Sequence, residues 1–180
     1  TPSDKLRGNP SKYLLYCDPF TGIFDADIQD GVNDYYKELY NKLSSVKATD
    51  DYKPYFESAT ALADVLSVKA ELGVKTRAAY LAGDTNKLKA IAENDYNAAV
   101  NKLRVFHKAF RKFWFFENKP HGFDVQDIRL GGLIMRLESC RDRLLEYCAN
   151  TDAKIPELSE PVLECERFGS WNNIVTANVI

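Results

Sequence analysis

Residues 85–117, with the sequence TNKLKAIAENDYNAAVNKLRVFHKAFRKFWFFE, determine the fold class of this chain. Apolar side chains recur along this stretch at the spacing of one helix face: Leu88, Ile91, Ala99, Leu103, Phe106, Phe110 and Phe113. This pattern predicts one long amphipathic helix. Pro120 ends it, because proline has no amide proton to donate and disfavours helix in the residue before it.

Shorter stretches with the same periodicity lie on both sides of this helix. Before it, apolar residues at helical spacing predict helices over residues 32–46 and 55–70, with Gly73 as a terminator, and a shorter helix through Ala78 and Tyr80. After it, the same pattern predicts a helix over about residues 126–149. The predicted fold class is therefore mainly α, a helical bundle formed by a C-terminal α-helical domain over residues 29–180.

The beginning of the chain differs from the rest. Residues 12–17 (KYLLYC) form a short apolar run between Pro10 and Asp18, which predicts a buried β-strand followed by a loop. A single strand cannot satisfy its own backbone donors and acceptors. We therefore expect its partner strands outside this chain, and interpret residues 1–28 as the end of an upstream domain or a linker.

Composition excludes several classes of function. The 24 basic and 26 acidic side chains nearly cancel, so neither nucleic acid nor a membrane is an expected partner. No apolar run approaches the roughly 18 residues that a membrane span needs. The 4 cysteines have neither Cys-x-x-Cys nor zinc-site spacing, so we expect no metal and no cofactor. Free thiols are typical of a reducing compartment, which predicts a cytoplasmic protein.

Tyr16 and Asp18 are the first candidate site residues. They lie two positions apart at the exit of the predicted strand, so their side chains should point to the same side and could reach one ligand. In a (β/α)8 barrel, active-site residues lie at the C-terminal ends of strands. The alternative is an edge tyrosine and an aspartate that initiates the turn before Pro19.

The connection between the two longest helices holds the second group of candidates. His121 is the residue that we expect to contact a ligand or partner, while Lys119, Asp127 and Arg129 are expected to brace the loop or form an interface by charge-assisted hydrogen bonds. The alternative is a well-fixed turn, in which Gly122 adopts an unusual backbone angle and an aspartate caps the next helix.

Three separated segments resemble bacterial exo-β-N-acetylhexosaminidases of glycoside hydrolase family 20. They are residues 9–19 (NPSKYLLYCDP), residues 119–133 (KPHGFDVQDIRLGGL), and the SWNN and ANV motifs within residues 170–179. The similarity extends over essentially the entire chain and fits the subgroup in which a C-terminal helical domain follows the catalytic barrel. It implies that the predicted strand is left over from that upstream (β/α)8 barrel.

The resemblance also implies a reaction, the removal of terminal non-reducing GlcNAc or GalNAc from glycans. In this family an adjacent Asp-Glu pair acts with the acetamide of the substrate in a retaining mechanism, the glutamate being the general acid/base. This sequence contains no Asp-Glu dipeptide. We therefore assign no catalytic residue here and expect the chain alone to be inactive. By resemblance, Tyr16 and Asp18 correspond to a Tyr-x-Asp motif that binds the acetamide oxygen and sugar hydroxyls.

The implied partners are the upstream catalytic barrel, a second copy in a homodimer of the full-length enzyme, and the glycan substrate of that enzyme. A different class of function stays open, a free-standing helical protein-interaction module without a glycosidase connection. Pairing of residues 12–17 within this domain would favour the module. A carbohydrate-binding module ranks last, because most aromatic side chains lie on predicted buried faces.

Overall fold

The computed structural model of the chain describes residues 10–162. Every regular element in this range is helical: α1 Pro10–Tyr16, η1 Asp25–Asp27, α2 Val32–Ser44, α3 Lys53–Lys69, α4 Leu72–Leu81, α5 Thr85–Ala90, η2 Ile91–Tyr96, α6 Asn97–Glu117, α7 Phe123–Ala149 and α8 Pro156–Ser159. The mainly helical fold class is thus confirmed. The SWNN and ANV motifs and Cys165 lie outside the described residues.

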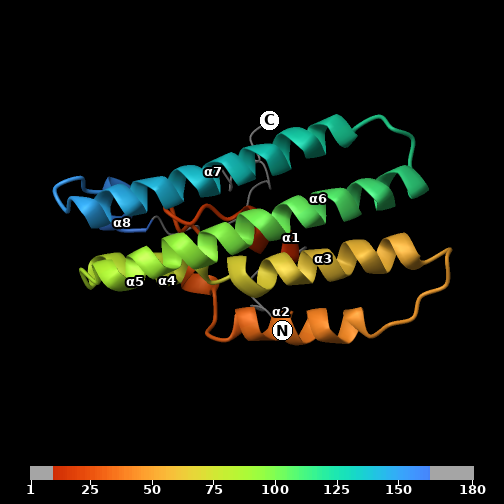
Figure 1. Ribbon diagram of the computed structural model, residues 1–180, viewed down its shortest axis with the longest axis horizontal. Helices are drawn as coiled ribbons and strands as arrows, with labels where there is room; N and C mark the ends of the chain where they lie inside the picture. Colours follow the sequence, from red (N-terminus) through yellow and green to blue (C-terminus); the bar gives the residue numbers. More distant parts are fainter. Residues whose placement is uncertain (1–9, 163–180) are drawn as a thin grey trace.

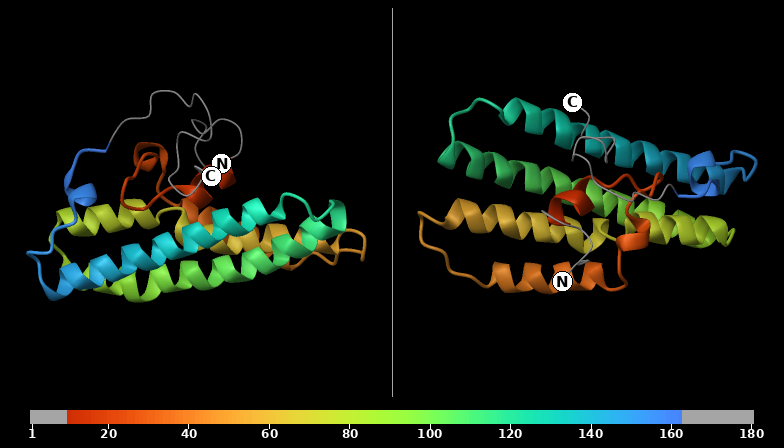
Figure 2. Two further views of the ribbon diagram at one scale, coloured as in Figure 1. Left: turned by 90° about the horizontal axis from the view of Figure 1, so that it is seen from above. Right: turned by 180° about the vertical axis from the view of Figure 1, so that it is seen from behind.

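The four long helices form a layer (Figure 1). Neighbouring contacts follow the order α2, α3, α6, α7, and each helix runs antiparallel to the next. Helix α1 and the loop after it lie on one face of this layer (Figure 2). The predicted bundle therefore takes the form of an open helical layer with one face covered by the beginning of the chain.

The strand predicted over residues 12–17 is wrong, because these residues belong to helix α1. A helix satisfies its backbone groups internally and needs no partner strand. Only 7 residues long, α1 is too short to persist alone and depends on tertiary packing, mainly against α3. Leu14 and Leu15 are buried there, 1% and 4% exposed. The apolar run was too short to distinguish a buried helix from a buried strand.

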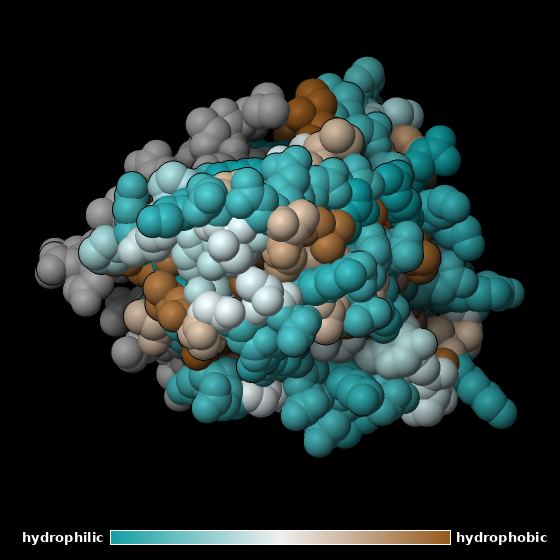
Figure 3. Space-filling model, turned by 60° about the vertical axis from the view of Figure 1, so that its left-hand side comes forward, coloured by the Kyte–Doolittle hydropathy of each residue, from teal (hydrophilic) through white to brown (hydrophobic). Residues whose placement is uncertain are grey.

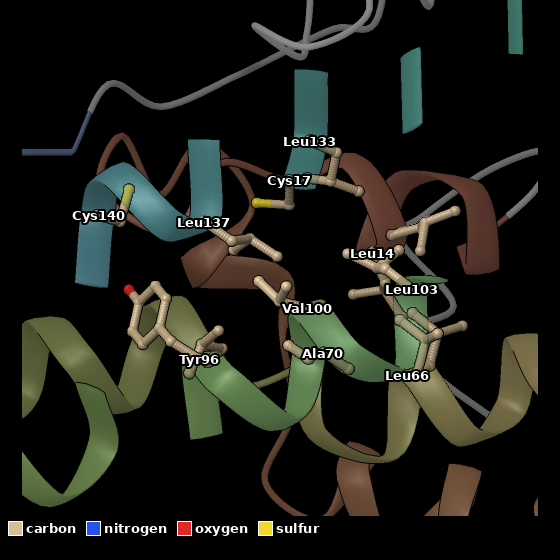
Figure 4. Packing of buried hydrophobic residues seen from close by; sticks show 14 of the residues in the cluster. Leu14, Cys17, Leu66, Ala70, Tyr96, Val100, Leu103, Leu133, Leu137 and Cys140 are labelled. Carbon is tan, nitrogen blue, oxygen red and sulfur yellow. The ribbon is translucent and has the colours of Figure 1, made fainter. Parts of the chain in front are cut away.

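The segment therefore packs within the helical domain, the outcome that sequence analysis associated with a self-contained module. Figure 4 shows Leu14 of α1 in one core with Leu66 of α3 and Leu103 of α6. The loop that follows contributes Phe20 and Phe24 to the same core, both fully buried. The division of the chain into residues 1–28 and 29–180 stays a prediction.

The helix predicted over residues 85–117 is present, with one irregularity. Residues Ile91–Tyr96 form a π-helical turn between α5 and α6, and the helix continues through it. Asp84 caps the beginning of α5 by accepting a 2.9 Å hydrogen bond from the Lys87 amide. Helix α7 begins three residues earlier than expected, and Gly73 lies inside α4 instead of ending α3.

Hydrophilic side chains cover most of the end of the layer that carries α5 and α8, with small apolar groups among them (Figure 3). None of the helices within residues 10–162 combines the length and apolar character that a membrane crossing requires.

Candidate functional site

A loop clamp holds the segment after α1 onto the helical layer. We use this name for residues 17–28 together with four cationic side chains that contact the loop or its neighbours: Lys69 of α3, Arg77 of α4, and Arg136 and Arg143 of α7. The clamp contains Asp18, one of the two candidates that sequence analysis placed at the exit of the predicted strand.

Asp18 is 4% exposed and has four hydrogen-bond donors around its carboxylate. Arg136 donates from Nε at 2.6 Å and from Nη2 at 3.2 Å, and the amides of Phe20 and Thr21 donate at 2.9 and 3.0 Å. Burial acts to raise the pKa of Asp18, but these hydrogen bonds outweigh burial and lower it. The carboxylate is therefore held as an anion that initiates the loop and anchors it to α7.

Lys69 closes the C-terminal end of α1. Its side chain is almost completely buried, and Nζ donates to the Cys17 carbonyl at 2.6 Å and the Leu14 carbonyl at 3.4 Å. Burial lowers the pKa of Lys69, although Cys17 and Asp18 act in the opposite direction. A cation near the last carbonyls of a helix stabilises it, so Lys69 also helps to explain why this segment is helical.

Arg77 joins the loop to α8. Its Nη2 donates to the Phe20 carbonyl at 2.5 Å and to the Glu157 carbonyl at 3.1 Å, and Nε lies 3.3 Å from Asp25 Oδ2. Burial raises the pKa of Asp25 to about 6, and the Arg77 charge offsets only part of this effect. One oxygen of Asp25, Oδ1, is buried without a hydrogen-bond partner among the described residues.

The loop lies close to α4 because position 73 is a glycine. A Cβ atom there would lie 3.1 Å from the Pro19 Cα atom, tighter than an ordinary contact. On the other side of the loop, Arg143 forms a two-pronged ion pair with Glu157, with distances of 2.6 and 2.8 Å. The guanidinium groups of Arg136 and Arg143 lie 5.4 and 5.3 Å from the centre of the Phe20 ring.

Tyr16 and Asp18 have different surroundings. Tyr16 ends α1, is 5% exposed, and lines a pocket of about 290 Å³ together with Arg129. The Asp18 carboxylate faces Arg136 within the clamp. The shared direction expected from a strand exit is therefore absent, because the backbone is helical here. Binding of acetamide or sugar hydroxyls by these residues stays a prediction.

The turn between α6 and α7 is well fixed. Gly122 has a φ of 91°, in the left-handed region that favours glycine, and its amide donates to Asp124 Oδ1 at 3.1 Å. Trp114 Nε1 donates to the Lys119 carbonyl at 3.2 Å. The side chains of Lys119 and His121 are exposed. The glycine angle predicted for the turn is confirmed, and the proposed contact of His121 with a ligand stays a prediction.

Asp127 and Arg129 lie further along α7 and face different neighbours. Asp127 Oδ1 is 2.6 Å from Nε2 of His107, and this contact links α7 to α6. Arg129 lines the same pocket as Tyr16, so it lies toward α1. Asp127 thus connects the two helices that the turn joins, and the structure brings Arg129 together with Tyr16 instead of with His121.

Sequence reasoning missed Lys69, Arg77 and Arg136. A weak signal existed for Lys69, which follows Leu66 by three residues and precedes Ala70 in the predicted buried stripe, where an unpaired charge would be unfavourable. Arg136 is 118 residues from Asp18, and no local pattern indicates that pairing. Within residues 10–162, no cluster of His, Cys, Asp and Glu side chains is suited to hold a metal ion.

Comparison with known protein families identifies the chain over nearly its whole length. Residues 1–175 match the family described as the Glycoside Hydrolase 20C C-terminal domain. No curated protein matches the chain. The match includes the segments that the sequence analysis singled out at residues 9–19 and 119–133.

Proposed function

Because the chain belongs to the Glycoside Hydrolase 20C C-terminal domain family, we propose that it supports the catalytic domain of a β-N-acetylhexosaminidase and is itself catalytically inactive. A C-terminal domain of a glycoside hydrolase implies an associated catalytic domain. The proposed reaction is the removal of terminal non-reducing GlcNAc or GalNAc from glycans, with retention of configuration and participation of the substrate acetamide. The catalytic Asp-Glu pair is assigned to the upstream barrel.

The state of the buried acids supports an inactive role. Glycoside hydrolysis requires an acid that contacts the glycosidic oxygen. Asp25 has a pKa of about 6, which would suit proton donation, but its side chain is 12% exposed and pairs with Arg77 under the loop. Asp18 is held as an anion by Arg136 and two amides. Both acids thus interact with groups of the loop clamp, and neither is placed to contact a glycosidic oxygen.

The turn between α6 and α7 is the surface that we assign to contact with the barrel or with a second copy in a homodimer. Lys119 and His121 are exposed on a turn whose backbone is restrained by Pro120 and by the hydrogen bond from the Gly122 amide to Asp124, so little backbone freedom is lost on binding. Phe115 and Phe116, 40% and 52% exposed, end α6 beside this turn. Exposed aromatic groups next to fixed polar groups are typical of interfaces.

The proposed location is the cytoplasm. Cys17, Cys140 and Cys148 carry free thiols, and reducing compartments keep cysteines unpaired. Burial raises the pKa of Cys17 to about 11 and that of Cys140 to about 12, so both thiols stay protonated and act as core residues.

The test compares the full-length parent enzyme with this 180-residue chain, using an aryl N-acetyl-β-glucosaminide and the matching galactosaminide as substrates. The parent enzyme is expected to hydrolyse at least one of them, whereas the purified chain is expected to be inactive while showing a helical circular dichroism spectrum. Turnover by the chain that persists through purification would contradict the inactive role. A parent enzyme that cleaves only sugars lacking the acetamide would contradict the hexosaminidase assignment.

A further inference from the structure

A long groove lies between α2, α3 and α6, and the proposed function does not account for it. Its volume is about 860 Å³, within the range of sites that bind small molecules. Helix α3 forms the longest wall, from Lys53 to Asp64, which corresponds to about 16 Å of helix. The groove is therefore elongated and suits a ligand longer than a single ring. We call it the α3 groove.

The α3 groove opens on the face of the helical layer that lies opposite α1. Glu57, Ala61 and Asp64 line it and follow one another at spacings of four and three residues, so they share one side of α3. Lys69, on another side of α3, donates to carbonyls of the α1 segment. In Figure 1 α1 lies behind α3 and α6, so the groove faces the viewer. It is thus separate from the loop clamp.

The floor of the α3 groove is apolar only in part. Tyr40 of α2 and Phe56 of α3 line it and are half-buried. Val46 and Val105, at its two sides, are 44% and 59% exposed. A docked amphipathic helix requires a row of apolar anchors along one face. Separate apolar groups among polar ones instead suit a ligand that has both apolar faces and polar edges.

The polar groups of the α3 groove place donors beside acceptors. Four lysines and three acidic residues line the groove, so their charges nearly cancel. Lys112 Nζ lies 3.2 Å from Glu57 Oε2, and Asp64 pairs with Lys102 two turns further along α3. A hydroxyl group both donates and accepts, so it can bridge the lysine and the carboxylate of one pair. A neutral polar ligand fits this arrangement better than an ion, which loses more solvation on binding.

We propose that the α3 groove binds a short neutral oligosaccharide that contains N-acetylhexosamine. A sugar ring has an apolar C–H face, which suits the rings of Tyr40 and Phe56, and hydroxyl edges, which suit the Glu57–Lys112 pair. The acetamide methyl group suits exposed Val105. The N-acetylhexosamine class rests on the proposed function, whereas the shape and charge balance of the groove do not. Binding here retains glycan chains near the catalytic domain.

The test uses triacetylchitotriose as the probe and cellotriose, which has no acetamide group, as its counterpart. Each is titrated into the isotopically labelled 180-residue chain and followed by amide chemical shifts. Triacetylchitotriose is expected to give saturable shifts along residues 53–64 and 105–112. It should bind about tenfold more tightly than cellotriose, because the acetamide groups add apolar contact and hydrogen bonds.

Two variants examine the groove itself. Tyr40→Leu removes the aromatic face and Glu57→Gln removes the charged acceptor, and each is expected to weaken triacetylchitotriose about tenfold. Glu38→Gln is the matched control, because Glu38 pairs with Lys42 on the surface of α2 and does not line the groove. No saturable binding, binding of cellotriose alone, or unchanged affinity in Glu57→Gln overturns the proposal. If Tyr40→Leu unfolds, Glu57→Gln on the half-buried wall still decides.

A footprinting experiment on the full-length enzyme distinguishes a sugar from a protein segment in the groove. Acetylation of Lys108, which lines the groove, is compared with that of Lys87 on exposed α5. Thio-linked chitotriose, which resists hydrolysis, should slow acetylation of Lys108 about threefold at twice its dissociation constant and leave Lys87 unchanged. If Lys108 is already protected without sugar, a protein segment fills the groove and the proposal is overturned.

Hydrolysis of an aryl N-acetyl-β-glucosaminide by the same preparation is measured separately. An enzyme that hydrolyses this substrate but shows no sugar protection of Lys108 contradicts the groove and leaves the proposed function intact. Protection of Lys108 by the sugar, without any hydrolysis of acetamido sugars, contradicts the hexosaminidase assignment and supports the groove.

Discussion

The loop clamp and the turn between α6 and α7 use the same residue types for different purposes. In the clamp, Asp18 is 4% exposed and its oxygens accept from Arg136 and from two backbone amides. In the turn, Lys119 and His121 are exposed, and the backbone is held by hydrogen bonds of the Lys119 carbonyl with Trp114 and of the Gly122 amide with Asp124. Hydrogen bonds hold both backbones, but in the turn the side chains of Lys119 and His121 are left to the solvent.

The difference shows why a cluster of polar residues in a sequence does not by itself identify a binding site. A buried charge must be paired within the domain, because removing it from water is otherwise too unfavourable. The groups that pair with it are then unavailable to a ligand. An exposed charge on a fixed backbone carries no such requirement, so it can serve an interface.

The largest expected effect comes from Arg136→Met, which leaves the Asp18 carboxylate buried with only its amide donors. Removing one partner of a buried ion pair typically destabilises by about 3–5 kcal/mol. The Arg136 side chain is 28% exposed, so the expected loss of unfolding free energy lies at the lower end of this range, about 3 kcal/mol. Urea unfolding of the 180-residue chain measures it.

Arg104→Met is the matched control for that measurement. Arg104 also pairs across helices, with Glu138 at 3.1 Å, but its side chain is 56% exposed. An exposed ion pair contributes at most about 1 kcal/mol. If both variants lost the same stability, burial of an ion pair would not determine its contribution to the free energy of unfolding. The argument that buried charges hold the loop clamp would then be wrong.

A second measurement uses the pH dependence of stability to examine Asp25. Burial raises its pKa in the folded state to about 6, above its ordinary value of 3.8. The folded state therefore binds this proton more tightly than the unfolded state. The resulting stabilisation is complete below pH 3.8 and is lost as the pH rises through about 6. We expect the full loss to be about 3 kcal/mol.

Asp25→Asn removes this titration while keeping a side chain of similar size near Arg77. The difference in unfolding free energy between the native chain and the variant should change between pH 4 and 6.5, by roughly 2 kcal/mol, in favour of the variant at the higher pH. Glu157, whose pKa is lowered to about 2 by Arg143, acts in a more acidic range. Parallel curves for both proteins would show that Asp25 titrates normally.

Sequence reasoning predicted the helices better than the clamp, for a physical reason. The long helices follow from local periodicity, and α2, α6 and α7 begin or end close to the predicted residues. The α1 segment was predicted as a strand, since a six-residue apolar run fits either period. Only contact with α3 and Lys69 makes the helix favourable. The Asp18–Arg136 pair depends on the tertiary fold, which local patterns do not contain.

The candidate site was predicted unevenly for the same reason. The Gly122 angle follows from local chemistry after Pro120 and was predicted correctly, whereas no aspartate caps α7, whose N-cap is Gly122. The neighbours of Asp127 and Arg129 depend on how α7 faces α6 and α1, which local patterns do not contain. The bracing or interface role of Lys119, Asp127 and Arg129 stays a prediction. Arg129 therefore lines the same pocket as Tyr16, although these two residues belong to separate motifs in the sequence.

The smallest effect on stability is expected at His121, and it tests whether the turn acts beyond this domain. His121 is exposed, so His121→Ala should change the unfolding free energy by less than about 0.5 kcal/mol. In the full-length enzyme the same variant should lower kcat/KM about fivefold, the effect of losing one hydrogen bond of about 1 kcal/mol at the aglycone region or interface. Lys87→Ala, on exposed α5, is the control and should leave kcat/KM unchanged. If His121→Ala instead melted the domain and left the kinetics intact, His121 would be a structural part of the turn, and the turn would resemble the clamp.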